Sequence, residues 1–285
     1  MWKTLTNSHS FIGCESSYDE AGIVIFGAPF DGTTSYRPGT RFAPSVIRSE
    51  SDGIETYSPY QDKDLEDYAI FDSGDLILPF GQPSKALALI EKRTKEILED
   101  DKRPLMIGGE HLVTLGVARA IIKKYPDVVF IHFDAHTDLR EDYLGEQLSH
   151  ATVIRRIWDL VGDGRIYQFG IRSGERSEWQ FANTHTDLTP FTLEGLDEVI
   201  ESLKGKPVYF TLDLDILDPS VFPGTGTPEA GGVTYKELQL ALEKLGALNI
   251  VGADMNELSP HYDHSGLSTA VACKVLREML LMMVD

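Results

Sequence analysis

Residues 127–138 read DVVFIHFDAHTD, and this stretch decides both the fold class and the place of a functional site. Its first half is a short apolar run rich in β-branched and aromatic residues, which is typical of a buried strand. Asp134, His136 and Asp138 follow at every second position. If the strand continued through them, its alternation would point all three side chains to one side. We therefore predict a bound cation at this point, since unpaired buried charges are very costly.

Runs of the same kind recur along the chain, separated by stretches with helical periodicity. The further apolar runs lie at residues 22–29, 103–110, 165–171, 207–215 and 249–258. Apolar residues recur near the 3.6-residue period of an α-helix at residues 84–101, 112–125, 152–161, 235–246 and 267–283. Alternating strands and helices predict an α/β fold, in which a mostly parallel sheet is covered by helices on both faces.

The chain length and the lack of sequence breaks predict a single domain over residues 1–285. A chain of 285 residues can bury a large core and lies within the size range of one α/β domain. No internal repeat, low-complexity segment or linker divides the sequence. The Gly- and Pro-rich segments 30–44 and 218–232 each follow a predicted strand, so we expect them to form ordered loops over a site.

The charge of the chain argues against two classes of partner. The chain has 45 acidic and 26 basic residues and a formal net charge of -19, whereas nucleic acids and anionic membranes attract positive surfaces. A small cationic ligand suits this composition better.

Cysteine content and hydropathy predict a soluble, cytoplasmic protein. Cys14 and Cys273 are too few for a disulfide framework or a thiolate zinc site. Residues 1–15 lack the apolar core of a secretory signal, and no apolar stretch reaches the ~20 residues needed to cross a bilayer. Any metal site would therefore use oxygen and nitrogen ligands.

Residues able to bind metal ions gather where the predicted strands end. They are His111, Asp134, His136, Asp138, Asp213 and Asp215. Ligands bind at this edge in open α/β sheets. Taken singly, each residue has another interpretation, because an Asp after a strand often caps a helix and a lone His is often a core residue. Taken together, these carboxylates and imidazoles predict a dinuclear metal site, because so many charged groups need a counterion.

The ligand set favours manganese. Mixed carboxylate and imidazole without thiolate suits Mn²⁺ better than a structural zinc ion, although other divalent ions could bind. Carboxylates shared between two ions would hold them about 3.5–4 Å apart, a spacing at which a bridging water becomes hydroxide near neutral pH. The nucleophile of such a site is a water molecule rather than a side chain.

Six sequence blocks, in order along nearly the whole chain, resemble those of the ureohydrolases, the arginase and agmatinase family. They are GGEH (108–111), FDAHTDLR (133–140), SHATVIRR (149–156), TLDLDILDP (211–219), GTGTPEAGG (224–232) and DMNELSP (254–260). The resemblance implies a three-layer α/β/α fold with an eight-stranded, mostly parallel sheet. It also implies two Mn²⁺ ions per chain, hydrolysis of a guanidino compound to urea and an amine by a metal-bridging hydroxide, and a homo-oligomer, a trimer or a hexamer.

The resemblance assigns roles residue by residue. One ion would be bound by His111, Asp134, Asp138 and Asp213. The other would be bound by Asp134, His136, Asp213 and Asp215, so that Asp134 and Asp213 bridge the two ions. Catalytic roles fall to His150, which would handle a proton, to Glu257, which would pair with the guanidinium group, and to Asp138. Asp254 receives no catalytic role.

Two of these residues also have plainer interpretations. Ser149 or Thr152 could cap a helix and leave His150 idle, and Glu257 could be a surface side chain. Ala151 departs from the family, which usually has Gly after the Ser-His pair, so the path of that loop is an open question.

The far end of the substrate is predicted mainly from what the chain lacks. Arginases carry a carboxylate-bearing segment where this chain has Ser173 and Gly174, so we expect agmatine, whose tail is a cationic amine. Glu175 could bind that amine or simply start a helix. Guanidinobutyrate, aminopropylagmatine, arginine and formiminoglutamate are the alternative substrates, and guanidinobutyrate would need a basic residue such as Arg172 or Arg176. A non-catalytic, metal-stabilised binding protein is the alternative of a different class.

Overall fold

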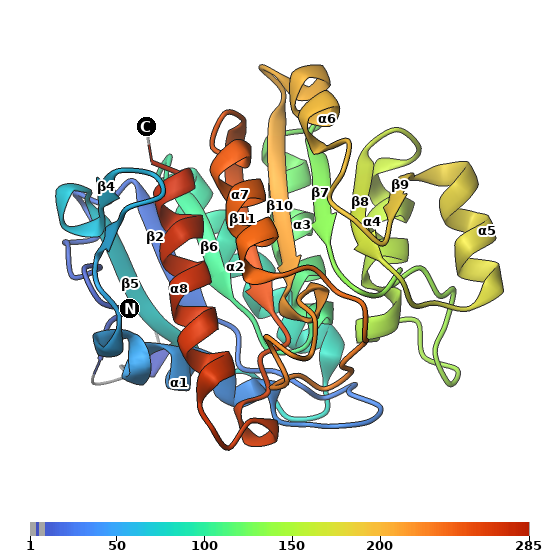
Figure 1. The fold of residues 1–285 in the computed structure, drawn as a ribbon, viewed down its shortest axis with the longest axis horizontal. Helices are drawn as coiled ribbons and strands as arrows, with labels where there is room; N and C mark the ends of the chain where they lie inside the picture. The colour runs from blue at the N-terminus through green and yellow to red at the C-terminus, as the bar shows by residue number, and fades with distance from the viewer. Residues whose placement is uncertain (1–3, 6–8, 285) are drawn as a thin grey trace.

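The structure, a computed structural model, describes residues 4–5 and 9–284. Within them, a nine-stranded sheet runs in the order β1-β5-β2-β6-β11-β10-β7-β8-β9 (Figure 1). The strands are β1 (Thr4–Leu5), β2 (Ile23–Gly27), β5 (Ile70–Leu76), β6 (Arg103–Ile107), β7 (Val129–Phe133), β8 (Ile166–Ile171), β9 (Asp187–Pro190), β10 (Pro207–Asp213) and β11 (Asn249–Asn256). A separate hairpin pairs β3 (Tyr57–Ser58) with β4 (Lys63–Asp64).

All neighbouring strands of this sheet are parallel except β1 and β5. Eight parallel strands therefore form the body of the sheet, and the two-residue β1 adds an antiparallel edge. The predicted fold class is confirmed.

Helices cover both faces of the sheet. They are α1 (Ala43–Glu50), α2 (Pro83–Glu99), α3 (Thr114–Lys124), α4 (Val153–Val161), α5 (Arg176–His185), α6 (Leu196–Leu203), α7 (Tyr235–Leu245) and α8 (Leu267–Met282). Figure 1 shows α7 and α8 in front of the sheet and α2 and α3 behind it.

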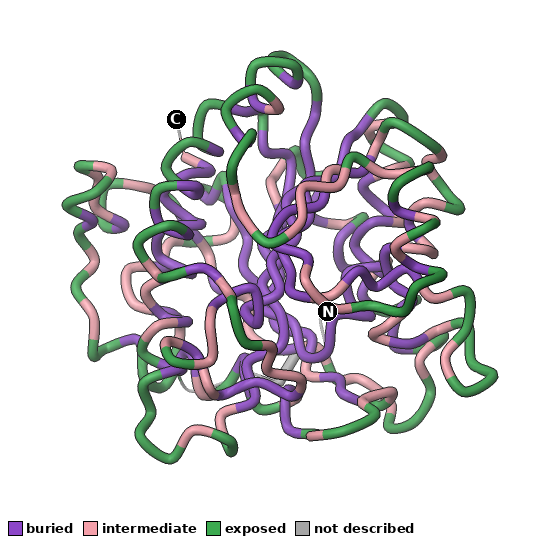
Figure 2. The backbone as a smooth tube through the Cα atoms, turned by 45° about the vertical axis from the view of Figure 1, so that its right-hand side comes forward, coloured by how far each residue is buried: buried purple, intermediate pink, exposed green. Residues whose placement is uncertain are grey.

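Two apolar cores lie between the sheet and the helices, one on each face of the sheet. In β2, Ile23 and Ile25 pack in one core while Val24 and Phe26 pack in the other, as alternation requires in a strand buried on both faces. The first core includes apolar side chains of α1, α6, α7 and α8, and the second includes those of α2, α3 and α4. The central strands are accordingly buried along their length, and exposure is concentrated on the outer helices and loops (Figure 2).

Four of these strands position the site. β6, β11, β10 and β7 are consecutive in the sheet, and all four run parallel. Their carboxyl ends therefore meet at one edge, where the loops that follow them lie close together. None of the helices in the part of the chain that the structure describes has the length and apolar character needed to cross a bilayer.

Candidate metal centre and active site

The six predicted metal ligands lie at or just beyond the carboxyl ends of three of these strands. His111 opens the 3₁₀ turn that follows β6. Asp134, His136 and Asp138 follow β7, and Asp213 is the last residue of β10. The structure brings all six to one place, with Asp215 contributed by the 3₁₀ turn Leu214–Ile216.

The convergence of Asp134, His136 and Asp138 has a different cause from the predicted one. A regular strand does not continue through them, because β7 ends at Phe133; beyond it, His136 forms a single isolated parallel bridge with Ser173. A loop brings the three side chains together instead. In that loop Asp138 has a φ of 52°, a conformation that residues with a Cβ rarely adopt. Such strained backbone is found preferentially at functional sites.

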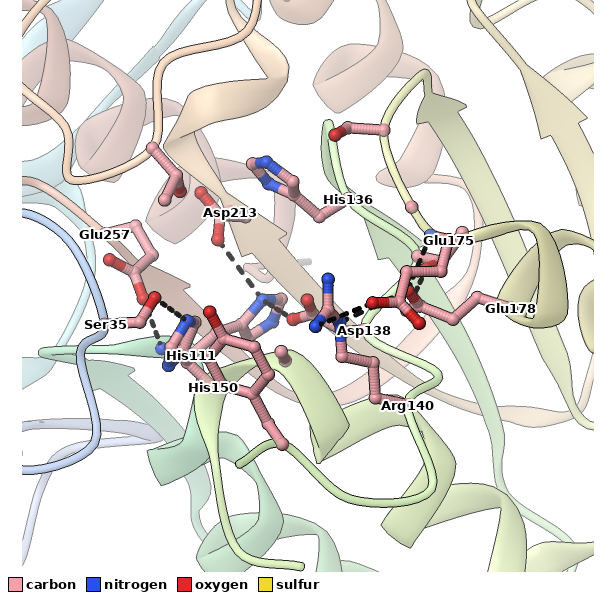
Figure 3. Close-up of a pocket in the computed structure, with 16 residues that line it drawn as sticks. Ser35, His111, His136, Asp138, Arg140, His150, Glu175, Glu178, Asp213 and Glu257 are labelled. Carbon is pink, nitrogen blue, oxygen red and sulfur yellow. Dashed lines mark hydrogen bonds and ion pairs between the residues drawn. The ribbon is translucent and has the colours of Figure 1, made fainter. Parts of the chain in front are cut away.

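His111 is the centre of a first group of ligands. Its Nδ1 atom lies 3.0 Å from Oδ2 of Asp134 and 3.2 Å from Oδ2 of Asp138. Oδ2 of Asp213 lies 3.3 Å from the same nitrogen. Three carboxylates therefore point at one imidazole nitrogen, as Figure 3 shows for Asp138 and Asp213.

His136 is the centre of a second group, which shares Asp134 with the first. Its Nδ1 atom lies 3.1 Å from Oδ2 of Asp215 and 3.5 Å from Oδ1 of Asp134. Backbone N–H groups fix both carboxylates, since Ala135 donates to Asp215 (3.2 Å) and His136 donates to Asp134 (2.6 Å). Asp134 is thus placed between the two imidazoles, as expected of a bridging ligand.

The cluster carries more negative charge than its imidazoles neutralise. Burial, together with the charge of Asp134, raises the pKa of Asp138 to about 7. Burial and the charge of Asp215 raise the pKa of Asp213 well above its usual value. Carboxylates that resist ionisation in this way are not fully compensated by the neighbouring imidazoles, and cations are the groups that would offset their remaining charge.

These residues fit a pair of divalent ions. Possible ligand atoms of His111, Asp134 and Asp138 lie within 4.8 Å of one another, and so do those of Asp134, His136 and Asp215. The donors are carboxylate oxygens and imidazole nitrogens, and both cysteines lie in the core instead. This donor set suits hard or borderline divalent ions.

His132 also lies within ligand distance, and the sequence interpretation missed it. Its Nδ1 atom lies 3.0 Å from Nε2 of Gln168, an amide nitrogen that also donates to the carbonyl of Thr137 (2.9 Å). Because a carbonyl can only accept, the amide orientation is fixed, and Nδ1 of His132 accepts. The ring proton is therefore on Nε2, which donates to Oδ2 of Asp134 (2.8 Å). We conclude that His132 orients a ligand rather than serving as one.

A pocket of about 340 Å³ opens above the two groups (Figure 3). Its walls include His111, His136, Asp138, Asp213, His150 and Glu257. Asp134 and Asp215 are almost fully buried beside it. Side chains of both candidate groups therefore face the same space as the two other predicted catalytic residues.

His150 faces this pocket from the turn His150–Thr152. Its ring nitrogens lie near hydroxyl groups, with Ser35 3.4 Å from Nε2 and Ser149 3.3 Å from Nδ1. Burial lowers the pKa of His150 to about 4, so the ring is neutral near pH 7. Ser149 and Thr152 do form a helix cap, since the N–H of Ser149 donates to the Thr152 hydroxyl (3.0 Å). The cap and the pocket-facing histidine therefore coexist.

Ala151 does not disturb this loop. It is not among the residues with positive φ, so the backbone there does not need glycine. Its carbonyl accepts from the backbone N–H of Arg140 (3.1 Å), which joins the loop to the end of the metal-ligand segment.

Glu257 is buried, not on the surface. It follows β11 with a φ of 67°, and its Oε1 accepts from the backbone N–H of His111 (2.7 Å). Burial, with a contribution from the charge of Glu110, raises the pKa of Glu257 well above its usual value. Within the described residues, no donor reaches Oε2, so this carboxylate is placed to accept a cation from the pocket.

Glu110 is a further residue that the sequence interpretation overlooked, although it lies in the GGEH block. It is completely buried and accepts from the N–H (2.8 Å) and hydroxyl (2.6 Å) of Thr33. The Thr33 hydroxyl in turn accepts from the backbone N–H of His150 (3.1 Å). Burial raises the pKa of Glu110 to about 7. Glu110 therefore anchors the loop around Thr33, and this loop places Ser35 beside the ring of His150.

The outer part of the pocket contains an arginine that was not anticipated. Arg140 contacts Glu175 (Nη1 to Oε1, 3.2 Å) and Glu178 (Nε to Oε2, 3.4 Å), and its guanidinium lies 4.5 Å from the ring centre of Tyr143. Figure 3 shows Arg140 pointing toward both glutamates. Glu178 is buried, whereas the Glu175 side chain is 60% exposed.

Glu175 and Arg172 can now be placed. Glu175 is the N-cap residue of α5, as the helix interpretation expects, and it also lines the pocket. Arg172 donates to four backbone carbonyls, those of Gly170, Asp215, Ile216 and Glu229. Both terminal nitrogens of its guanidinium group therefore already donate to the backbone. Arg176, the first residue of α5, does not line the pocket.

A three-layer α/β/α fold with a pocket over two joined carboxylate–imidazole groups defines a class of protein: an α/β protein with a candidate two-metal site. The arginase family model matches residues 21–282. An agmatinase from Bacillus subtilis (strain 168) is 50% identical over 275 residues, which make up 95% of each chain. The chain therefore belongs to the arginase family, and it is an agmatinase-like ureohydrolase.

Two further similarities show how broad the resemblance is. The crystal structure of agmatine ureohydrolase from Thermoplasma volcanium covers 98% of this chain and 95% of its own, with a TM-score of 0.87 and 33% identity. A guanidinobutyrase from Pseudomonas aeruginosa is 34% identical over 92% of this chain and 86% of its own. The family resemblance seen in the sequence blocks is thus confirmed over nearly the whole chain.

Proposed function

We propose that the protein hydrolyses agmatine to putrescine and urea with the help of two manganese ions. The ions would be held by His111, Asp134, His136, Asp138, Asp213 and Asp215. The observation that carries the proposal is the position of Asp134 between the imidazoles of His111 and His136, beside a pocket that is lined by His150 and Glu257. When bound, a pair of divalent ions supplies Lewis acidity and a nucleophilic water near neutral pH.

Glu257 is placed to bind the guanidinium group of the substrate. A guanidinium remains charged at any working pH and presents parallel N–H donors to a carboxylate. Glu257 is buried, and burial with the charge of Glu110 raises its pKa. A bound cation would offset the cost of the buried carboxylate, and so substrate binding and Glu257 ionisation support each other.

His150 is placed to move a proton. Cleavage of the C–N bond leaves an amine that must pick up a proton, and a neutral imidazole can accept one and pass it on. With its pKa lowered to about 4, His150 is neutral at pH 7, so one of its ring nitrogens carries no proton. Ser35, 3.4 Å from Nε2, connects this nitrogen to the pocket wall.

The outer pocket favours a cationic tail. One arginine, Arg140, faces two glutamates, Glu175 and Glu178, so the local balance is negative. The amine of agmatine can pair with the exposed Glu175. The carboxylate of arginine or guanidinobutyrate would have to draw Arg140 away from its two glutamates. That would leave the buried carboxylate of Glu178 without Arg140, and an unpaired buried charge costs several kcal/mol.

A substrate panel tests this proposal. Urea release from agmatine, arginine, guanidinobutyrate and aminopropylagmatine, and formamide release from formiminoglutamate, are measured at one pH with added Mn²⁺. We expect agmatine to exceed arginine in kcat/KM by at least about 100-fold, a difference of roughly 3 kcal/mol in transition-state binding. If arginine matched agmatine, the substrate assignment would be wrong. If guanidinobutyrate led the panel, Arg140 would be the residue that binds the tail.

A further inference from the structure

The two ring nitrogens of His111 face different surroundings. Nδ1 points at the carboxylates of the candidate metal centre, the nearest being Asp134 at 3.0 Å. Nε2 points away from the pocket, into the sheet, and lies 2.9 Å from the hydroxyl oxygen of Thr211. An imidazole can bind a metal ion only through a nitrogen that carries no proton. The position of the His111 proton therefore decides whether Nδ1 is available as a ligand.

The surroundings of Thr211 decide that position. Thr211 and Asp254 are paired residues of the neighbouring strands β10 and β11. The Thr211 hydroxyl donates to Oδ1 of Asp254 across 2.6 Å, because an ionised carboxylate can only accept. A hydroxyl has one proton, and this bond uses it. The lone pairs of the Thr211 oxygen are then left to accept from an N–H at Nε2 of His111.

Asp254 is held as an acceptor by more than Thr211. It also accepts from the hydroxyl of Tyr209 and from the side-chain amide of Asn256 (Nδ2 to Oδ1, 2.6 Å). Asp254 is completely buried, so these bonds are not shared with bulk water. Burial raises the pKa of Asp254, and the three donors converging on this carboxylate act against that rise by favouring its ionised form. Neither Asp254 nor Thr211 lines the pocket, so neither can touch a substrate there.

We propose that Asp254 and Thr211 are positioning residues that hold the proton of His111 on Nε2 and so keep Nδ1 free to bind a metal ion. The proposal rests on the metal-binding role proposed for His111. It gives Asp254, which had no catalytic role, a function exerted through two hydrogen bonds in sequence. Removing such a partner of a ligating histidine typically lowers metal affinity by about 10- to 100-fold.

Titration of the full chain with Mn²⁺ alone tests the proposal. The protein is stripped of metal with a chelator, and binding is followed by isothermal titration calorimetry. Thr211→Val preserves the shape of the side chain but removes the hydroxyl, whereas Thr211→Ser preserves the hydroxyl. We expect the valine variant to bind Mn²⁺ about 10- to 100-fold more weakly and the serine variant to stay within about threefold of the parent. Parent-like affinity in the valine variant, or equal weakening in both, would overturn the proposal.

A second matched pair covers the case in which Thr211→Val does not fold. Thr211→Ala and Thr211→Ser both lose the methyl group, so they differ only in the hydroxyl. The alanine variant should bind Mn²⁺ more weakly than the serine variant, and equal affinities would refute the role of the hydroxyl. Asp254→Asn should weaken binding too, because a neutral amide oxygen is a poorer acceptor for Thr211; unchanged affinity would remove Asp254 from the proposal.

These measurements use no substrate. The titrations can therefore show that Mn²⁺ affinity depends on the Thr211 hydroxyl even if agmatine proves not to be the substrate. Conversely, the parent protein could hydrolyse agmatine while the Thr211 variants bind Mn²⁺ equally well, and that result would refute only the role of Thr211. The two proposals thus fail on different observations.

Discussion

The backbone N–H of His111 donates to Oε1 of Glu257 across 2.7 Å. The bond joins a candidate metal ligand after β6 to the candidate guanidinium-binding residue after β11, and these two strands are neighbours in the sheet. The backbone of Glu257 has a φ of 67°, a strained conformation that the surrounding structure has to hold. A guanidinium group bound to the remaining oxygen of Glu257 would therefore lie beside the ligand cluster, where reaction geometry is set by the scaffold.

His150→Ala should lower kcat while leaving the metal content intact. The residue lines the pocket but is not part of either ligand group. Loss of one general acid–base group typically lowers the rate by a factor of about 10² to 10⁴. The check is kcat together with the number of ions per chain by elemental analysis. Loss of ions in the variant would reassign His150 to the ligand set.

His150 should also make the stability of the metal-free protein depend on pH. Its pKa falls from 6.5 to about 4 on folding, so between these values the unfolded chain binds a proton that the folded chain does not. The free energy of unfolding should then decrease as the pH falls from 6.5 toward 4. Urea unfolding at several pH values should give a shallower decrease for His150→Asn. An identical pH dependence in the two proteins would show that His150 is not buried in its neutral form.

Substitutions at His132 and Asp134 should separate a supporting residue from a ligand. His132→Leu removes the donor to Asp134 and should weaken Mn²⁺ binding by about 10- to 100-fold without changing the number of ions bound at saturation. Asp134→Asn removes the shared carboxylate and should reduce that number. Calorimetric titration gives both quantities. One ion at saturation in His132→Leu would mean that His132 is itself a ligand.

Glu175→Gln should weaken the binding of agmatine more than its turnover. The Glu175 side chain is 60% exposed, and exposed ion pairs contribute about 0.2–1 kcal/mol, so we expect KM to rise about two- to fivefold with kcat little changed. Glu201→Gln is a suitable control, because that glutamate of α6 pairs with Lys204 and does not line the pocket. Unchanged KM in Glu175→Gln would leave Glu175 as a helix cap alone.

The sequence predicted the elements whose side chains are apolar enough to reveal them. β6, β10 and α8, for example, were expected within a few residues of their observed bounds. β5 was missed because it carries Asp72 and Asp75 inside the sheet. Arg48 of α1 offsets part of their charge, since it donates to Asp72 at 2.7 Å and also pairs with Asp75. A partner this far away in sequence cannot be inferred from local periodicity.

The site was predictable to a similar extent. All six proposed ligands, His150 and Glu257 were identified from motifs, and the structure brings them together. The roles of Glu110, His132 and Arg140 were not, although each lies in or beside a quoted block. Their roles depend on partners from other elements, such as Thr33 for Glu110 and Gln168 for His132. Only the folded chain shows which groups meet.

Metal-dependent urea release tests the central claim most directly. The purified protein is stripped with a chelator, assayed with agmatine, and assayed again after Mn²⁺ is restored, with the bound ions counted by elemental analysis. We predict that stripping abolishes urea release and that activity returns as two Mn²⁺ ions bind per chain, as expected for a two-metal hydrolase. Urea release by the stripped protein, or a single bound zinc ion with activity indifferent to Mn²⁺, would contradict the account.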